Sequence, residues 1–235
     1  MTVSTLTIVM PVLNEATGIT AALQALAPLV ARGVQLVVAD GGSTDHTAAC
    51  AQPIAMDAGV QDHVKVIHAP RGRALQMNAG AQQSAGDVLL FLHADTLLPP
   101  HADALVQQAL ASGLHVWGRF DVRIEGRSRL LPVIAAFMNR RSRWSGIATG
   151  DQAMFMTRAA FDAVAGFGAQ PLMEDIAMSS RLRQLSAPAC LPARVLTSGR
   201  RWETRGVWRT VLLMWRLRFA YWRGTPPERL AQRYR

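Results

Sequence analysis

Acidic residues follow three of the apolar runs in the first hundred residues, at the points where those runs end. Asn14-Glu15 follows the first run, Asp40 follows the second and Asp95 follows the fourth. One acidic residue after a strand is common in ordinary loops and would carry little weight. In an open parallel sheet, however, ligands bind at the carboxyl ends of the strands. Three such positions on one sheet edge therefore favour a polar ligand site.

The elements that would position these residues alternate between strands and helices. Continuous apolar runs predict buried strands, and the stretches between them predict helices. We expect strands at 6–12, 35–39, 64–68 and 88–92, and helices at 16–31, 45–57, 74–85 and after Pro99-Pro100. This alternation predicts an α/β fold, with a mostly parallel sheet flanked by helices.

The pattern changes after residue 113. Apolar residues alternate from 115 to 124, which predicts an exposed strand or a strand in a mixed sheet. We expect a short apolar helix at 130–139, a strand at 152–157, and helices at 174–184 and 207–221. The chain, 1–235, is predicted to be a single domain made of a first half (1–112), a mixed-sheet half (113–206) and a basic amphipathic tail (207–235).

The composition is that of a folded protein. Of the 235 residues, 50% are hydrophobic and 17% are charged, which excludes a disordered chain. Two cysteines, Cys50 and Cys190, are too few for a disulfide framework or a four-thiolate zinc site. The N-terminus has no basic region of a targeting segment, and no apolar run is a good candidate to span a bilayer. We therefore expect a cytoplasmic protein.

The formal net charge of +9 is concentrated near the C-terminus. Residues 200–235 contain ten arginines and two glutamates, a net +8, so the rest of the chain is nearly neutral. Nucleic-acid binding is disfavoured, because the arginines are interleaved with a large apolar surface.

Tryptophans and arginines recur every seven residues in this region. Trp208, Trp215 and Trp222 would form one row on a helix, and Arg209, Arg216 and Arg223 another. Either the tryptophans lie at a bilayer interface with the arginines on lipid phosphates, or they pack into the core beside a solvated arginine face. The apolar segment 130–138 is also bracketed by arginines. Two such segments favour a peripheral contact with the cytoplasmic membrane face.

Four sequence blocks resemble the family-2 glycosyltransferases. They are IVMPVLNE (8–15), VVADGGSTD (37–45), LFLHADT (90–96) and the Glu-Asp pair at 174–175, in that order. The resemblance runs from residue 6 to about 206 and is greatest for short single-domain bacterial members with RGRALQMNAGA-like and SGRRWETRG-like segments, a branch that includes enzymes of carotenoid-acid or arsenosugar glycosylation. It implies the GT-A fold and sugar transfer from a nucleotide diphosphate donor. Residues 1–112 would then bind the nucleotide sugar, and 113–206 the acceptor.

The resemblance assigns the nucleoside pocket to the first two strand ends. Pro11 and Leu13 would wall the base, and Glu15 would bond the ribose. Asp40 matches the aspartate that accepts a hydrogen bond from uracil, which favours a UDP-linked sugar. Gly41 stands where the family often has a second aspartate. Asp45 is expected to cap the following helix.

A metal site is implied at the end of the fourth strand. Asp95 matches the second aspartate of the family's Asp-x-Asp, with Ala94 between it and His93. A carboxylate and the donor's diphosphate would hold Mg²⁺ or Mn²⁺. His93 replaces the first aspartate, and imidazole suits Mn²⁺ better than Mg²⁺. His93 would either ligate the metal or bond the ribose or a phosphate.

The catalytic base is implied in the Glu174-Asp175 pair. Asp175 matches the carboxylate that takes a proton from the acceptor, and Glu174 lies beside it. One base without a covalent nucleophile implies direct displacement with inversion at the sugar. The alternative is that the two acids only open a helix, where they favour the helix dipole.

The remaining assignments concern the diphosphate and the acceptor. The resemblance implies that Arg71, Arg73 and Asn78 lie near the diphosphate. The alternative for one of the two arginines is a solvated side chain without a ligand. Asp151 would bond sugar hydroxyls. Arg201 and Trp202 either hold a phosphate and stack on the acceptor, or form a structural stack at a strand end. The acceptor would offer a hydroxyl or carboxyl group on a small or lipid-like molecule.

Three rival interpretations remain. A nucleotidyltransferase also combines a nucleotide pocket with acidic metal ligands, but it usually needs a Gly-rich basic loop where this chain has Asn14-Glu15-Ala16. A methyltransferase would need its Gly-rich turn after the first strand. A non-catalytic protein that binds a membrane surface through the basic tail is the third.

Overall fold

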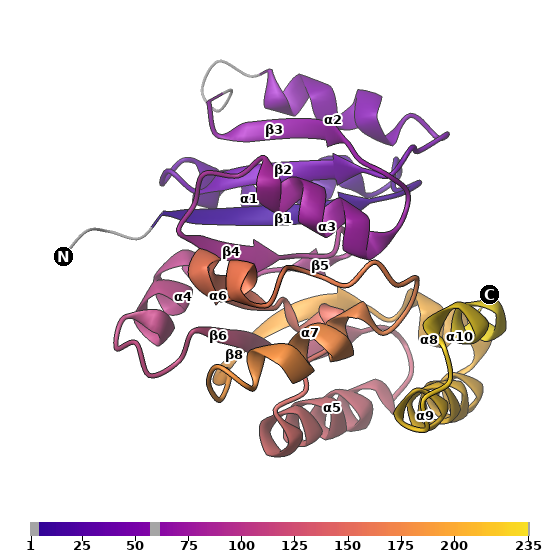
Figure 1. Cartoon of the computed structure of the whole chain (residues 1–235). Coiled ribbons are helices and arrows are strands. Elements are labelled where there is room, and N and C mark those ends of the chain that lie inside the picture. Colours follow the sequence, from indigo (N-terminus) through magenta and orange to yellow (C-terminus); the bar gives the residue numbers. More distant parts are fainter. Residues whose placement is uncertain (1–4, 57–61, 235) are drawn as a thin grey trace.

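One eight-stranded sheet runs through the molecule and joins the two predicted halves (Figure 1). The computed structural model describes residues 5–56 and 62–234. The strand order is β3-β2-β1-β4-β7-β6-β8-β5, so four strands of the first half form one side of the sheet, and the strands of the second half form the other side together with β5 (Thr96–Leu97) of the first half.

The first half is the alternating arrangement that the sequence predicted. Its strands are β1 (Leu6–Val12), β2 (Gln35–Asp40), β3 (Val64–His68) and β4 (Val88–Phe91). Its helices are α1 (Ile19–Val30), α2 (Thr47–Ala55), α3 (Arg73–Gln82) and α4 (Ala102–Leu110). The pairs β1–β2, β1–β4 and β2–β3 are parallel. The last residue of the helix predicted at 45–57 lies outside the described residues.

Strands β1, β2 and β4 are buried along almost their whole length because helices cover both faces of the sheet. Alternate residues of β1 point to opposite faces: Ile8 and Met10 belong to the larger core cluster, and Val9 to the smaller one. On the side of Val9, α3 lies close to the strand. A Cβ on Gly80 would stand 2.4 Å from a methyl group of Val9, so only glycine permits this approach.

The second half forms the mixed part of the sheet. Its strands are β6 (Trp117–Glu125), β7 (Phe155–Thr157) and β8 (Ala189–Ser198), and the short strand β5 (Thr96–Leu97) of the first half pairs with β8 at the edge. Strand β7 is antiparallel to β4 and β6, and β8 is parallel to β6. The mixed sheet is confirmed, but β6 is buried rather than exposed because α5 packs against it. The strand predicted at 152–157 begins only at Phe155, since a 3-10 turn, η1 (Gly150–Gln152), precedes it.

The remaining helices lie around this mixed part. They are α5 (Leu131–Ser145), α6 (Arg158–Ala163), α7 (Glu174–Leu182), α8 (Arg200–Arg205), α9 (Val207–Trp222) and α10 (Pro227–Tyr234). Helix α5 is longer than the predicted 130–139 and ends at Gly146, which has a positive φ of 66°. The predicted last helix is followed by a further one, α10. Helices α8, α9 and α10 gather at lower right in Figure 1.

The tail packs on the body without burying its tryptophan row. Leu217 of α9 and Leu230 of α10 form a small cluster with Met173, immediately before α7. Trp208, Trp215 and Trp222 are 60–78% exposed, so the alternative in which this row packs into the core is wrong. Among residues 5–56 and 62–234, no helix is both long and apolar enough to cross a bilayer.

Candidate active site

The loops after β1 and β2 are held together by hydrogen bonds at the carboxyl end of the sheet. The backbone N–H of Asn14 donates to Ser43 Oγ at 2.9 Å, and Thr44 N–H donates to Asn14 Oδ1 at 2.9 Å. Asn14 takes a positive φ of 56°, which asparagine tolerates well. The strand end that carries Glu15 is therefore fixed against the strand end that carries Asp40.

The two aspartates of the second loop make local contacts. Asp40 is buried and accepts hydrogen bonds from the backbone N–H groups of Gly42 and Ser43, each at 3.1 Å. Asp45 accepts from Thr47 N–H at 3.2 Å, at the start of α2, and from Ala16 N–H at 3.0 Å. Asp45 thus binds the first N–H of α2, but it precedes the N-cap position, which is held by His46 without a side-chain bond. The nucleobase role of Asp40 stays a prediction.

Gln76 connects the ends of β1 and β2 to α3. It was not identified as a site residue from the sequence. Its buried side-chain amide donates to the carbonyl of Val12 at 2.7 Å and to that of Ala39 at 2.9 Å. A Cβ on Gly41 would stand 2.8 Å from Cδ of Gln76. Gln76 therefore occupies the space that a side chain at position 41 would need, which explains the glycine where a second aspartate was expected.

The end of β4 brings further polar residues to the same edge. His93 Nδ1 lies 3.4 Å from Asp151 Oδ1, and Asp151 leaves 47% of its side chain exposed. Burial raises the pKa of Glu15, and Asp95 raises it further, whereas Arg200, whose Nη2 is 3.8 Å from Glu15, lowers it. Glu15, Asp95, His93 and Asp151 thus share one electrostatic environment.

These residues could hold a divalent cation only together with the diphosphate of the donor. Within the part of the chain that the structure describes, no three His, Cys, Asp or Glu residues lie close enough together to hold a metal ion. Asp95 is exposed at the strand end. Its carboxylate could provide one hard oxygen ligand, with most of the others supplied by diphosphate and water.

The Glu174-Asp175 pair opens α7, close to the η1 turn. Asp175 Oδ2 accepts the backbone N–H of Gly150 at 2.9 Å, and Glu174 is buried and paired with Arg73 at 3.0 Å. Burial, followed by the charge of Glu174, raises the pKa of Asp175 to about 6. Arg73 loses part of its basicity to burial, but the three carboxylates around it, those of Glu174, Asp175 and Asp151, outweigh this and raise its pKa.

A small cavity of about 10 Å³ lies where these residues meet. Its polar lining comes from His93, Gly150, Arg73 and the acidic pair, and its apolar lining comes from buried side chains: Met77, Phe91, Met154 and Phe167. The apolar part withdraws the Asp175 carboxyl from water, which is the physical cause of its raised pKa. A raised carboxyl pKa next to a second charged pair is typical of catalytic sites.

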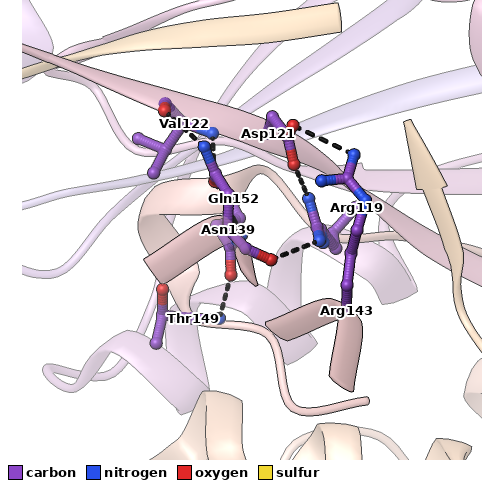
Figure 2. A network of polar contacts seen from close by, with 7 residues as sticks. All are labelled: Arg119, Asp121, Val122, Asn139, Arg143, Thr149 and Gln152. Atoms are coloured by element: carbon purple, nitrogen blue, oxygen red, sulfur yellow. Dashed lines mark hydrogen bonds and ion pairs between the residues drawn. The ribbon is translucent and has the colours of Figure 1, made fainter. Parts of the chain in front are cut away.

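A buried polar network holds the η1 turn from behind (Figure 2). Asn139 of α5 accepts from Val122 N–H at 2.8 Å and donates to the Val122 carbonyl at 3.0 Å. Its Oδ1 also accepts from Gln152 at 3.4 Å, and Gln152 in turn accepts from Thr149 N–H at 3.2 Å. The turn that carries Gly150 and Asp151 is therefore tied to β6 and α5.

An ion-pair cluster extends this network. Fully buried Arg119 is bonded to Asp121 and donates to the carbonyl of Asn139 at 3.1 Å, and Arg143 pairs with Asp121 at 3.0 Å. These residues were not predicted as site residues from the sequence. The signal was present, since Arg119 and Asp121 stand two apart on the polar positions of an otherwise alternating strand.

The other expected donor residues lie around the same edge. Pro11 and Leu13 are half-buried at the end of β1, Ala94 is half-buried beside His93, and Arg71 is exposed before α3. Asn78 uses both polar atoms of its amide on the backbone of Phe167, each at 2.8 Å. Asn78 therefore supports the loop between α6 and α7, and its contact with a diphosphate stays a prediction.

Arg201 and Trp202 begin α8 beside the site. Burial lowers the pKa of Arg201, while the charge of Asp151 opposes that effect. Its guanidinium lies 4.7 Å from the ring centre of Tyr234, and Trp202 packs against the main core cluster. Both residues therefore make structural contacts, which was one of the two alternatives predicted from the sequence. Arg201 is also close enough to Asp151 and Asp95 for their charges to oppose the effect of burial on its pKa.

Known proteins match this chain in sequence and in fold. The sequence profile described as Glycosyl transferase family 2 matches residues 7–165, which include Glu15, Asp40, Asp95 and Asp151. The PGL/p-HBAD biosynthesis glycosyltransferase of Mycobacterium tuberculosis is 36% identical over 110 residues, which is 46% of this chain and 41% of that protein. The chain therefore matches less than half the length of this relative.

Two solved structures show the same fold. The mannosyltransferase PcManGT from Pyrobaculum calidifontis, in complex with GDP-Man and Mn²⁺, superposes with a TM-score of 0.66 at 18% identity, over 92% of this chain and 61% of that chain. TarS 1–349 of S. aureus, in complex with UDP, gives 0.64 at 14% identity, over 83% of this chain and 60% of that chain. The fold is the predicted GT-A fold. Because the family profile covers well over half of the sequence, the chain belongs to glycosyl transferase family 2.

Proposed function

We propose that the protein transfers a sugar from a nucleoside diphosphate donor, UDP-linked, to a hydroxyl or carboxyl group of a lipid-like acceptor, with inversion at the anomeric carbon. The observation that carries this proposal is the position of Asp175. Its carboxyl group is fixed by Gly150, has a pKa of about 6 and shares a cavity lining with His93, two residues before Asp95.

Asp175 acts as the general base. At neutral pH a carboxyl group with a pKa of about 6 is ionised, yet it holds a proton better than an ordinary aspartate. As the oxygen of an acceptor hydroxyl bonds to the anomeric carbon, its proton passes to Asp175 and the nucleoside diphosphate leaves with the electron pair of the broken bond. A single displacement of this kind inverts the sugar.

The surrounding residues orient the reactants and balance charge. Arg73 neutralises Glu174, so that two adjacent carboxylates can exist in the same site. Asp151 lies 3.4 Å from His93 of the cavity lining, and its charge acts on Arg201, so sugar hydroxyls and a phosphate are expected beside these two residues. Asp95, with His93 as the candidate second ligand, would hold a divalent cation, which would supply positive charge to neutralise the departing diphosphate.

The relatives support a nucleotide-sugar donor. GDP-Man, UDP and UDP-GlcNAc are bound in the solved structures of similar fold, and Mn²⁺ accompanies one of them. The mycobacterial relative is named for PGL/p-HBAD biosynthesis. UDP is preferred here on the match of Asp40. We propose that the acceptor is reached at the cytoplasmic face of a membrane.

Calorimetric titration of UDP, GDP and CDP, with and without Mn²⁺, tests the proposal. We expect metal-dependent binding of UDP and weaker binding of the other two. Glu15→Gln should weaken UDP binding, whereas Glu228→Gln, at an exposed position of α10, should not. If none of the nucleotides binds in the presence of metal, the proposed function is wrong.

A further inference from the structure

Helices α5 and α9 present two adjoining rows of exposed apolar side chains, which we call the aromatic face. The row on α9 consists of Trp208, Leu212, Trp215, Phe219 and Trp222, each 60–78% exposed. The row on α5 consists of Val133, Phe137 and Trp144, each 54–91% exposed. The rings of Phe137 and Trp215 lie 6.2 Å apart, so the two rows are continuous.

The spacing makes each row a straight stripe. In α9 the row advances by three or four residues at a step, which keeps its members on one side of the helix over about 21 Å. Leu217, on the opposite side of α9, is only 2% exposed and packs against the body. The large apolar groups therefore face outward although the same helix offers a buried side.

The charge around the aromatic face has a single sign. Neither α5 nor α9 contains an acidic residue. Exposed Arg209, Arg216 and Arg223 run beside the tryptophans at the same seven-residue spacing, and exposed Arg140 lies on α5 between Phe137 and Trp144. Tryptophan places its ring at the boundary between lipid tails and headgroups, and arginine reaches lipid phosphates while its stem stays in apolar surroundings.

A groove on the side of α9 that faces the body and α10 also combines apolar and basic residues. It measures about 410 Å³, lies between α9 and α10, and is lined by three apolar residues and two arginines: Leu213, Leu217, Ala220, Arg216 and Arg233. An acyl chain fits such apolar walls, and a phosphate fits the two guanidinium groups.

We propose that the aromatic face binds the surface of an anionic phospholipid bilayer, with α9 lying in the plane of the interface. An interfacial helix of this kind needs a wide apolar side and basic residues along it, and both are present. The inference deepens the proposed function, on which it rests only for the identity of the acceptor.

The position of α9 gives this binding a consequence for the site. Leu217 packs on Met173, and Ile176 packs against the same cluster, so the contacts of α9 flank the Glu174-Asp175 pair on both sides in sequence. The thickness of about one helix, roughly 10 Å, separates the aromatic face from these contacts. A lipid-borne acceptor in the bilayer would thus be presented near the catalytic base.

Vesicle co-sedimentation of the full chain tests the proposal, with phosphatidylcholine vesicles and with phosphatidylcholine–phosphatidylglycerol vesicles. We expect binding to the anionic vesicles and at least about 10-fold less for the combined variant Trp208→Ser, Trp215→Ser and Trp222→Ser. The matched control replaces three exposed apolar residues on other elements, Met56→Ser, Leu114→Ser and Leu185→Ser, and should bind like the original chain.

The arginine row has its own test. Replacing Arg209, Arg216 and Arg223 by glutamine should weaken binding to the anionic vesicles by about 100-fold, since each basic residue near such a surface contributes roughly five-fold. Binding of the original chain should fall with added salt, and that of this variant should change little.

Three results would overturn the proposal. The first is that the original chain binds neither kind of vesicle, and the second is that the tryptophan variant binds as well as the original. The third is that light scattering shows a dimer that the tryptophan substitutions dissociate, with no vesicle binding, because the face would then belong to a second copy. UDP titration of each variant keeps the two proposals separate: loss of nucleotide binding alone removes the transferase, and loss of vesicle binding alone removes the bilayer contact.

Discussion

The backbone N–H of Gly150 donates a hydrogen bond to Oδ2 of Asp175 over 2.9 Å and so joins the η1 turn to the start of α7. The other carboxylate oxygen accepts from Ile176 N–H at 2.8 Å. Both bonds favour the ionised carboxylate, yet burial and Glu174 outweigh them and raise the pKa of Asp175 to about 6. The proposed base is therefore held in one orientation beside Asp151 while it keeps a measurable affinity for a proton.

Gln76 should stabilise both the fold and the donor pocket. In Gln76→Leu the two hydrogen bonds to Val12 and Ala39 are lost, and we expect the free energy of unfolding to fall by about 2 kcal/mol. UDP affinity should fall as well, because these carbonyls fix the strand ends beside Glu15 and Asp40. Denaturant unfolding and calorimetry measure the two effects. The control is Gln82→Leu, at an exposed position of the same helix. Equal stability of the two variants would contradict the role of Gln76.

Asp95 should account for the metal dependence of turnover. With Mn²⁺ present, Asp95→Asn should lower the release of nucleoside diphosphate from the donor by about 100-fold or more, because charge neutralisation by a bound metal is worth several kcal/mol. After chelation of the metal, Asp95→Asn and the original chain should have equal, low rates. Asp62→Asn, at an exposed position, serves as the control. A large difference that persists in chelator would show that Asp95 acts without a metal.

The rate should depend on the ionisation of Asp175. Only the deprotonated carboxyl accepts a proton, so turnover should be constant well above pH 6 and fall about tenfold per pH unit below it. Glu174→Gln removes a neighbouring negative charge, which lowers the pKa of Asp175. The acidic limb of the pH–rate profile should therefore move to lower pH. A profile that is flat between pH 5 and 7, with no limb near 6, would contradict this assignment.

A strand buried on both faces could be predicted from the sequence with correct ends. The predicted 6–12 is β1 residue for residue, because a nearly unbroken apolar run marks a strand covered on both faces. The predicted 64–68 is β3 residue for residue, although this edge strand leaves Lys65 and His68 exposed. Strand β8 could not be found in this way. Its register with β6 skips Pro192 and Ala193, and arginine follows at 194, so neither an apolar run nor a regular alternation marks it.

The acidic residues at the strand ends could be predicted from the sequence, whereas the residues that hold those strand ends in place could not. Glu15, Asp40 and Asp95 follow from a rule about parallel sheets and from motif blocks. Gln76 does not, because its function depends on how α3 crosses two strand ends that are far away in sequence. The tryptophan row shows a further limit: a seven-residue period is the same for a buried and an exposed row, and only the packing of Leu217 on the other side decided between them.

The measurement that tests the central claim most directly is the turnover and donor affinity of Asp175→Asn. Asparagine keeps the size of the side chain but cannot take a proton at neutral pH. We expect release of nucleoside diphosphate from the donor, in the presence of an acceptor, to fall by about 10²–10⁴-fold while UDP binds as before. Asp162→Asn, at an exposed position of α6, should change neither quantity. Turnover of Asp175→Asn equal to that of the original chain would show that Asp175 is not the base.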